Sequence, residues 1–151
     1  MAARFTGPYA SAGPYEDEQG DRYDVRLEKV PGGVRLAEWA LGQIRRRAPV
    51  LSAPDLRSLI DDVRERSLLP ERDAEALAQA VAVPGEGDGA SRGRAGDMQE
   101  ELRVERLEDG RVRIGRWILR PGAGWELQEA PVMLPVKRYA EAIRGAGILA
   151  G

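Results

Sequence analysis

Two stretches decide the fold because they repeat one pattern: VRLEKVPGGVRLAEWAL (Val25 to Leu41) and LRVERLEDGRVRIGRWIL (Leu102 to Leu119). Each begins with a segment in which apolar and charged residues alternate, as expected for a strand with one buried face. A Gly-containing turn and a second alternating segment follow. Asp109-Gly110 in the second stretch is a strong hairpin signal. The sequence therefore predicts matching β-hairpins in the two halves of the chain.

The match continues beyond the hairpins. APVL (Ala48 to Leu51) corresponds to APVM (Ala130 to Met133), and LRSLIDDVRERSLL (Leu56 to Leu69) corresponds to VKRYAEAIRGAGIL (Val136 to Leu149). Four blocks in one order indicate an internal duplication of a strand–strand–strand–helix unit. We predict an α+β fold of two βββ(β)α repeats, over residues 21–69 and 99–151, packed as an intramolecular pseudo-dimer.

The duplication resolves the structure of the segment Val34 to Leu41. Alone, VRLAEWALGQIRRR is compatible with an amphipathic helix, because Leu36, Ala40 and Ile44 fall at helical spacing. The corresponding segment, Val112 to Leu119, follows an Asp-Gly turn and alternates like a strand. We therefore predict a strand over Val34 to Leu41.

Helical signals follow the strands in each copy. In the first copy Ser52 and Asp55 resemble a capping box, with Pro54 in the first turn. In the second copy Pro135 opens the helix, and Gly145 or Gly147 closes it. Residues 70–83 have high helix propensity, which predicts one extra helix after the first repeat.

Composition indicates two irregular segments. Residues 1–20 are predicted to be a disordered tail, and the Gly-rich residues 84–98 a flexible linker. At 151 residues, the chain is too short for two large domains, so residues 21–151 are expected to form one compact domain.

Composition also excludes several classes of function. The chain has no Cys and no His, which removes thiol nucleophiles, His-based triads and the usual zinc ligands. We expect no enzyme activity, no cofactor and no metal. The first residues lack the pattern of a signal peptide and no apolar run could span a bilayer, so a cytoplasmic protein without membrane contact is expected. The net charge of −2 means that any polyanion site must be a local patch.

The strand faces opposite the predicted core carry arginine and tryptophan in both copies. These residues are Arg26, Arg35 and Trp39 in the first copy and Arg103, Arg113 and Trp117 in the second, with Arg45, Arg46 and Arg47 following the first set. Aromatic rings that stack bases and guanidinium groups that hold phosphates are typical of single-stranded nucleic-acid platforms. Two alternatives remain open. Trp39 and Trp117 are buried in an interface between the two copies or under a helix, with the arginine stems covering them, and Arg45 to Arg47 are a solvated charge run.

Three short segments carry a resemblance to a known family. They are Gly110, Arg111 and Ile114 at a strand start, Val132 to Pro135 at a strand exit, and Arg22-Tyr23 before the first strand. With the duplicated unit, which covers about 100 residues, the chain resembles the PUR repeat of purine-rich-element-binding proteins (Pur-alpha type). It is also similar to Whirly proteins and to transcriptional coactivators of the positive-cofactor type.

The resemblance implies that two repeats intertwine, that each helix packs on the other repeat's sheet, and that the exposed sheets bind single-stranded DNA or RNA. The binding positions that it implies are Arg26, Arg35, Trp39, Arg103, Arg111, Arg113 and Trp117. The leading expectation is a non-enzymatic single-stranded nucleic-acid-binding protein. The alternative is a protein-interaction adaptor on the same fold, with a different protein or a second copy of the chain as its partner.

Overall fold

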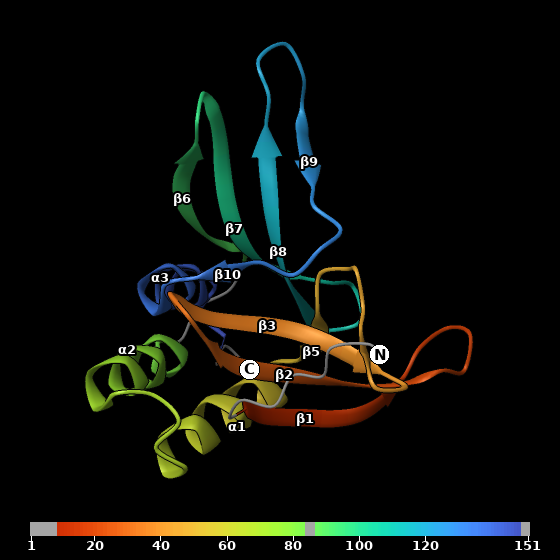
Figure 1. Ribbon diagram of the computed structural model, residues 1–151, viewed down its shortest axis with the longest axis vertical. Coiled ribbons are helices and arrows are strands. Elements are labelled where there is room, and N and C mark those ends of the chain that lie inside the picture. Colours follow the sequence, from red (N-terminus) through yellow and green to blue (C-terminus); the bar gives the residue numbers. More distant parts are fainter. Residues whose placement is uncertain (1–8, 84–86, 149–151) are drawn as a thin grey trace.

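The computed structural model describes residues 9–83 and 87–148. In this part of the chain the fold is α+β, with two antiparallel sheets and three helices (Figure 1). Residues 1–8, 84–86 and 149–151, which belong to the predicted tail, linker and second repeat, lie outside the described residues.

The first half of the chain supplies five strands and two helices. They are β1 (Tyr9–Glu16), β2 (Arg22–Val30), β3 (Gly33–Ala40), β4 (Gln43–Ile44), β5 (Val50–Ser52), α1 (Ala53–Glu65) and α2 (Glu71–Ala82). The predicted strand at Val34 to Leu41 is confirmed as β3, which ends one residue early. Leu41 lies instead in the following turn with a positive φ of 53°.

The second half supplies five strands and one helix. They are β6 (Gly89–Ala95), β7 (Met98–Arg106), β8 (Arg111–Leu119), β9 (Trp125–Leu127), β10 (Met133–Leu134) and α3 (Val136–Ala146). The predicted Asp109-Gly110 turn joins β7 to β8. Gly147 caps α3 in the left-handed conformation, with φ 59°, which matches one of the two predicted closing residues.

Each half contributes a short strand to the sheet of the other half. The first sheet has the order β1-β2-β3-β10 with β4 also paired to β3, and the second has β5-β8-β7-β6 with β9 also paired to β8. Thus Leu51 of β5 lies opposite Val112 of β8, and Leu134 of β10 lies opposite Val34 of β3. The chain therefore crosses between the sheets twice, once before α1 and once before α3.

The helices lie mainly against strands of their own half. α1 packs on β1, where the Tyr15 hydroxyl donates a hydrogen bond to the Asp55 carboxylate. α3 packs on β6 and β7, where Arg138 bonds Ser91 and Glu100. The expectation that each helix packs on the other repeat's sheet is therefore wrong. The elements exchanged between the two halves are the short strands β5 and β10.

One apolar core joins both halves. It is formed by the inward side chains of both sheets and the apolar stripes of all three helices, including Leu27, Leu36, Leu56, Leu77 and Ile143. Within the described residues, no helix is long and apolar enough to cross a membrane.

Residues 9–16 are a strand, where the composition predicted part of a disordered tail. β1 pairs with β2 from Tyr9↔Glu28 to Glu16↔Arg22, with an irregularity between Ala12 and Tyr15. Ala10 is buried in the core, and Tyr15 contacts α1. The prediction of disorder is wrong here because pairing with β2 and contacts with α1 outweigh the low strand propensity of a Gly- and Pro-containing segment.

Residues 89–95 are also a strand, where the composition predicted part of a flexible linker. Gly89 and Ser91 are buried, and a Cβ on Gly89 would lie 2.1 Å from the carbonyl oxygen of Ala142 in α3. Glycine here therefore permits close packing of β6 against α3, whereas the composition alone indicates flexibility.

Candidate nucleic-acid interface

The second sheet has an outer face opposite its core face. Leu102, Val104, Val112 and Ile114 point into the core, so the alternating neighbours in β7 and β8 point outward. We define the outer face of the second sheet by its exposed and half-buried side chains on β6, β7, β8 and β9: Arg92, Arg94, Glu101, Arg103, Glu105, Arg113, Trp117, Trp125 and Leu127. α3 packs on the opposite face, and the hairpins β6–β7 and β8–β9 project beyond the helices (Figure 1).

A guanidinium group lies against two indole rings on this face. The Arg103 guanidinium carbon is 4.6 Å from the ring centroid of Trp117 and 4.9 Å from that of Trp125. The Glu101 carboxylate holds this guanidinium through a 2.8 Å bond to Nε. The Trp117 Nε1–H donates to Glu105 at 2.9 Å, so this ring is fixed from a second side. The result is an ordered aromatic and cationic surface on a sheet face.

The first sheet carries a similar arrangement with a different degree of burial. The Arg26 guanidinium carbon lies 4.4 Å from the Tyr9 ring and 4.9 Å from the Trp39 ring, and Asp24 holds its Nε at 2.8 Å. Trp39 is only 6% exposed, and its buried Nε1 has no hydrogen-bond partner among the described residues. Trp39 thus matches the alternative in which arginine stems cover the ring, whereas Trp117 is half-buried.

Cross-strand carboxylates neutralise two further predicted arginines. Arg35 makes a bidentate pair with Glu28, at 3.0 and 3.2 Å, and this carboxylate is fully buried. Arg113 makes a longer pair with Glu105, with both contacts at 3.3 Å, and in the part of the chain that the structure describes its buried Nε has no hydrogen-bond partner. Arg35 is therefore committed to a structural pair, while Arg113 is held less tightly.

In the run Arg45 to Arg47, the first and last residues contact the buried carboxylate of Glu38, although the Arg47 side chain is itself 45% exposed. Glu38 points to the core side of β3 and is fully buried. Its Oε1 accepts a 2.5 Å bond from Arg47 Nε and lies 3.6 Å from Arg45, while its Oε2 accepts the Val50 backbone N–H at 3.0 Å. Arg46 is exposed. Because a buried carboxylate requires compensation, Arg45 and Arg47 are neither platform residues nor a purely solvated run.

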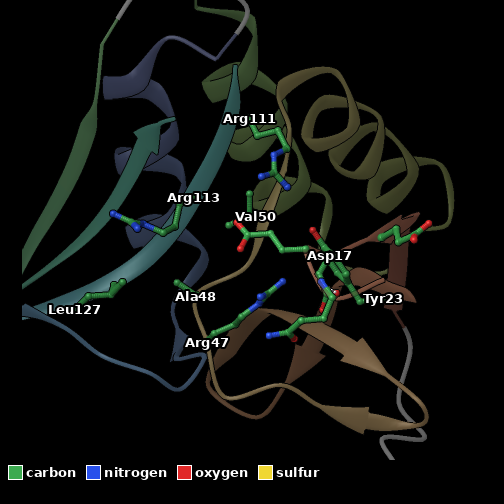
Figure 2. Close-up of a pocket in the computed structure, with 11 residues that line it drawn as sticks. Asp17, Tyr23, Arg47, Ala48, Val50, Arg111, Arg113 and Leu127 are labelled. Carbon is green, nitrogen blue, oxygen red and sulfur yellow. Dashed lines mark hydrogen bonds between the residues drawn. The ribbon is translucent and has the colours of Figure 1, made fainter. Parts of the chain in front are cut away.

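A cavity of about 390 Å³ lies between the two sheets, and we call it the inter-sheet cleft. Its lining comes from the β1–β2 turn, β2, the segment leading into β5, β8 and β9: Glu16, Asp17, Glu18, Gln19, Tyr23, Arg47, Ala48, Val50, Arg111, Arg113 and Leu127. In Figure 2 the guanidinium groups of Arg47 and Arg111 approach the cleft from opposite sides, whereas that of Arg113 extends away from them. The structure thus brings together three predicted arginines from distant parts of the sequence.

Titration behaviour in the cleft follows from these contacts. Hydrogen bonds from the Asp21 backbone N–H and from the Arg45 side chain hold the pKa of Asp17 below its usual range. Burial raises the pKa of Tyr23, and the Glu38 carboxylate adds to the effect. The Asp109 carboxylate raises the pKa of Arg111 against the opposing effect of burial. At neutral pH the cleft therefore presents a neutral phenol, an ionised Asp17 carboxylate and a charged Arg111 guanidinium group.

A buried polar cluster anchors α3 beneath the outer face of the second sheet. Burial alone would raise the pKa of Glu100, but bonds from Arg116 at 2.6 Å and Arg138 at 2.9 Å hold it below its usual range. Arg138 also donates to Ser91 Oγ at 2.6 Å, and Ser91 Oγ donates to Glu141 at 3.1 Å. This cluster fixes β6 and β7 to the helix, and so supports the strands that carry the outer face.

The candidate site predicted from the sequence omits three aromatic or cationic residues of the outer face. Trp125 lies after a Gly-rich turn, and Arg92 and Arg94 lie in the segment predicted as linker. The alternation of Arg92 and Arg94 with the small residues Ser91 and Gly93 is the sequence signal that could have revealed the strand. No group of three or more potential metal ligands occurs in residues 9–83 and 87–148.

Comparisons with known proteins give no relative for this chain: no family model, no curated protein and no solved structure matches it.

Proposed function

We propose that this protein binds single-stranded DNA or RNA on the outer face of the second sheet. The observation that carries the proposal is the contact of the Arg103 guanidinium with the indole rings of both Trp117 and Trp125, on a sheet face opposite α3. An aromatic side chain can stack a base at about 1–3 kcal/mol, and guanidinium groups contact phosphates. A half-buried ring in a fixed position loses little side-chain entropy on binding.

The charges of this face support a polyanionic ligand. Arg92, Arg94, Arg103 and Arg113 carry four positive charges, against two negative charges on Glu101 and Glu105, which leaves an excess of two. The Arg92 side chain is 87% exposed, and its ion pair with Glu101 is long, at 3.5 Å. Arg94 is also exposed. These two arginines can therefore reach phosphates with little loss of existing contacts.

The proposal includes a duplicated PUR- or Whirly-like arrangement of the two halves. Both halves have the order of four strands, a crossing strand and a helix, and they exchange the crossing strands β5 and β10. Corresponding side chains support the duplication: Asp24 and Arg26 against Trp39 in one half match Glu101 and Arg103 against Trp117 in the other. The burial of Trp39 makes the second sheet the main binding surface.

Fluorescence anisotropy with labelled single-stranded oligonucleotides tests the proposal. We expect Trp125→Ala to weaken binding by about tenfold, the value of one lost stacking contact. Arg94→Gln should weaken binding to all sequences to a similar extent and lower the salt dependence by about one unit in the log–log slope. Arg57→Gln is the matched charge control, because Arg57 is exposed on α1. Unchanged affinity in the Trp125 variant would contradict the proposal.

One observation favours the alternative of a protein adaptor. Leu41 is 96% exposed at the tip of the β3–β4 turn, beside a surface hollow that Arg26 and Trp39 also line. An exposed apolar side chain at such a tip suits a protein partner. Loss of partner binding in Leu41→Ser, together with no binding of any oligonucleotide by the unmodified protein, would favour this alternative.

A further inference from the structure

The inter-sheet cleft holds two guanidinium groups in a defined orientation. Glu38 engages Nε of Arg47 at 2.5 Å, and Asp109 engages Nε of Arg111 at 2.7 Å. Both carboxylates therefore bind the inner nitrogen of the side chain, and the two guanidinium groups approach the cleft from opposite sides (Figure 2). Between them, Tyr23 hydrogen-bonds the Arg111 side chain and lies under the Arg47 guanidinium, whose carbon is 5.2 Å from the ring centroid. Forked guanidinium groups held in this way match the oxygens of a phosphate.

The other walls of the cleft suit a small organic phosphate. Ala48, Val50 and Leu127 provide apolar surface, and Tyr23 provides an aromatic side chain. The volume of about 390 Å³ lies in the range of small-ligand sites. An inorganic ion would leave most of this space unfilled, so a phosphate attached to a larger organic group is the better fit.

The cleft is continuous with the outer face of the second sheet. Arg113 and Leu127 belong to both, and Arg113 pairs in register with Val50 of the crossing strand β5. A nucleic-acid strand bound on the outer face would therefore reach the cleft at the N-terminal end of β8.

We propose that the inter-sheet cleft binds a phosphomonoester, with the guanidinium groups of Arg47 and Arg111 on the phosphate oxygens. The ligand has two sources with the same chemistry: the terminal phosphate of a bound single strand and a free nucleoside monophosphate. The first source rests on the proposed function, whereas the second does not. Glu16, Asp17 and Glu18 also line the cleft. Asp17 is paired with Arg45, whereas Glu16 and Glu18 are exposed and repel the entering anion, so they set a limit on its affinity.

The experiment compares oligonucleotides of one sequence that carry an internal fluorophore and a 5′-phosphate, a 3′-phosphate or hydroxyl ends only. We expect one of the phosphorylated strands to bind about tenfold more tightly than the hydroxyl-ended strand, as for one charge-assisted contact. Adenosine monophosphate and inorganic phosphate, measured by calorimetry, form the second arm. The nucleotide should bind and the inorganic ion should bind more weakly.

Arg111→Gln is the principal variant. The partner of Arg111, Asp109, is solvent-exposed, so removal of the guanidinium group leaves no buried charge. It should remove the preference for a phosphorylated end and the binding of adenosine monophosphate, while hydroxyl-ended strands bind as before. Glu18→Gln should strengthen both phosphate effects, and Arg57→Gln should change neither.

The two proposals fail differently. If hydroxyl-ended and phosphorylated strands bind equally and adenosine monophosphate does not bind, the cleft proposal is overturned while the proposed function stands. If no strand binds but adenosine monophosphate binds and Arg111→Gln abolishes this binding, the proposed function fails and the cleft proposal stands. Retention of the phosphate effects in Arg111→Gln overturns the assignment to the cleft.

Discussion

At Gly89 the backbones of β6 and α3 lie close together, and Gly89→Ala tests this packing. A Cβ there would lie 2.1 Å from Ala142 O, 2.3 Å from Ala146 N and 2.7 Å from Gly145 C, whereas ordinary contacts begin near 3.4 Å. All three neighbours are backbone atoms, so no side-chain rotation relieves the overlap. α3 must move away from β6 by roughly 1 Å, a substantial distortion of a close-packed interior.

The movement would disturb the inner contacts of α3. Tyr139, Ile143 and Ala146 are buried on this helix, and Arg138 is bonded to Ser91 and Glu100. Overpacking in a filled core costs about 1–3 kcal/mol, and the backbone contacts place this variant at the upper end. A loss of about 3 kcal/mol in a chain of this length lowers Tm by on the order of 10 °C.

Thermal unfolding followed by circular dichroism measures the effect. Gly124→Ala is the matched control, because a Cβ at Gly124 has no neighbour within 4 Å and its φ is outside the positive range that strains other residues. We expect the control to remain within about 1 kcal/mol of the unmodified protein. If the Tm of Gly89→Ala stays at the value for Gly124→Ala, the close packing of β6 against α3 is refuted.

Two further predictions concern a turn and a buried carboxylate. Leu41 and Gly42 occupy a two-residue hairpin turn with φ values of 53° and 76°, a conformation that Asn-Gly favours, so Leu41→Asn should raise the stability by about 0.5–1 kcal/mol in urea unfolding. A destabilised variant would contradict this description of the turn. Glu100→Gln should lower the stability by about 2 kcal/mol at pH 7, because Arg116 and Arg138 lose their charged acceptor. The folded pKa of Glu100 is depressed, so its contribution is present above the unfolded value of about 4.3 and is lost as the pH falls through the folded pKa. The difference in stability between the two proteins should therefore narrow below about pH 5 in thermal unfolding, and a constant difference down to pH 3 would contradict the assignment.

The strands with regular alternation could be predicted from the sequence, and the strands rich in small residues could not. β3 has a partner segment with the same spacing, which resolved the ambiguity between helix and strand. β1 and β6 contain Gly and Pro, and their structure depends on pairing with β2 and β7 and on contacts with α1 and α3. Local propensity does not contain this information, because the stabilising contacts come from residues far away in the sequence.

The candidate site was predictable in part for a related reason. Alternation placed Trp39 and Trp117 on outward strand faces, but it does not show how much neighbouring side chains cover each ring. The Arg45 and Arg47 side chains pair with Glu38, because the β3–β4 turn brings the chain back beside β3. The sequence therefore indicated which residues face outward, whereas their exposure depended on contacts that only the structure shows.

The salt dependence of single-stranded oligonucleotide binding tests the central claim most directly. Four outer-face arginines, Arg92, Arg94, Arg103 and Arg113, each contacting one phosphate, predict that log K falls with log salt concentration at a slope of about −3. Stacking on Trp117 and Trp125 predicts that tryptophan fluorescence is quenched as the strand binds. Anisotropy that stays flat at low salt for both DNA and RNA strands would contradict the account.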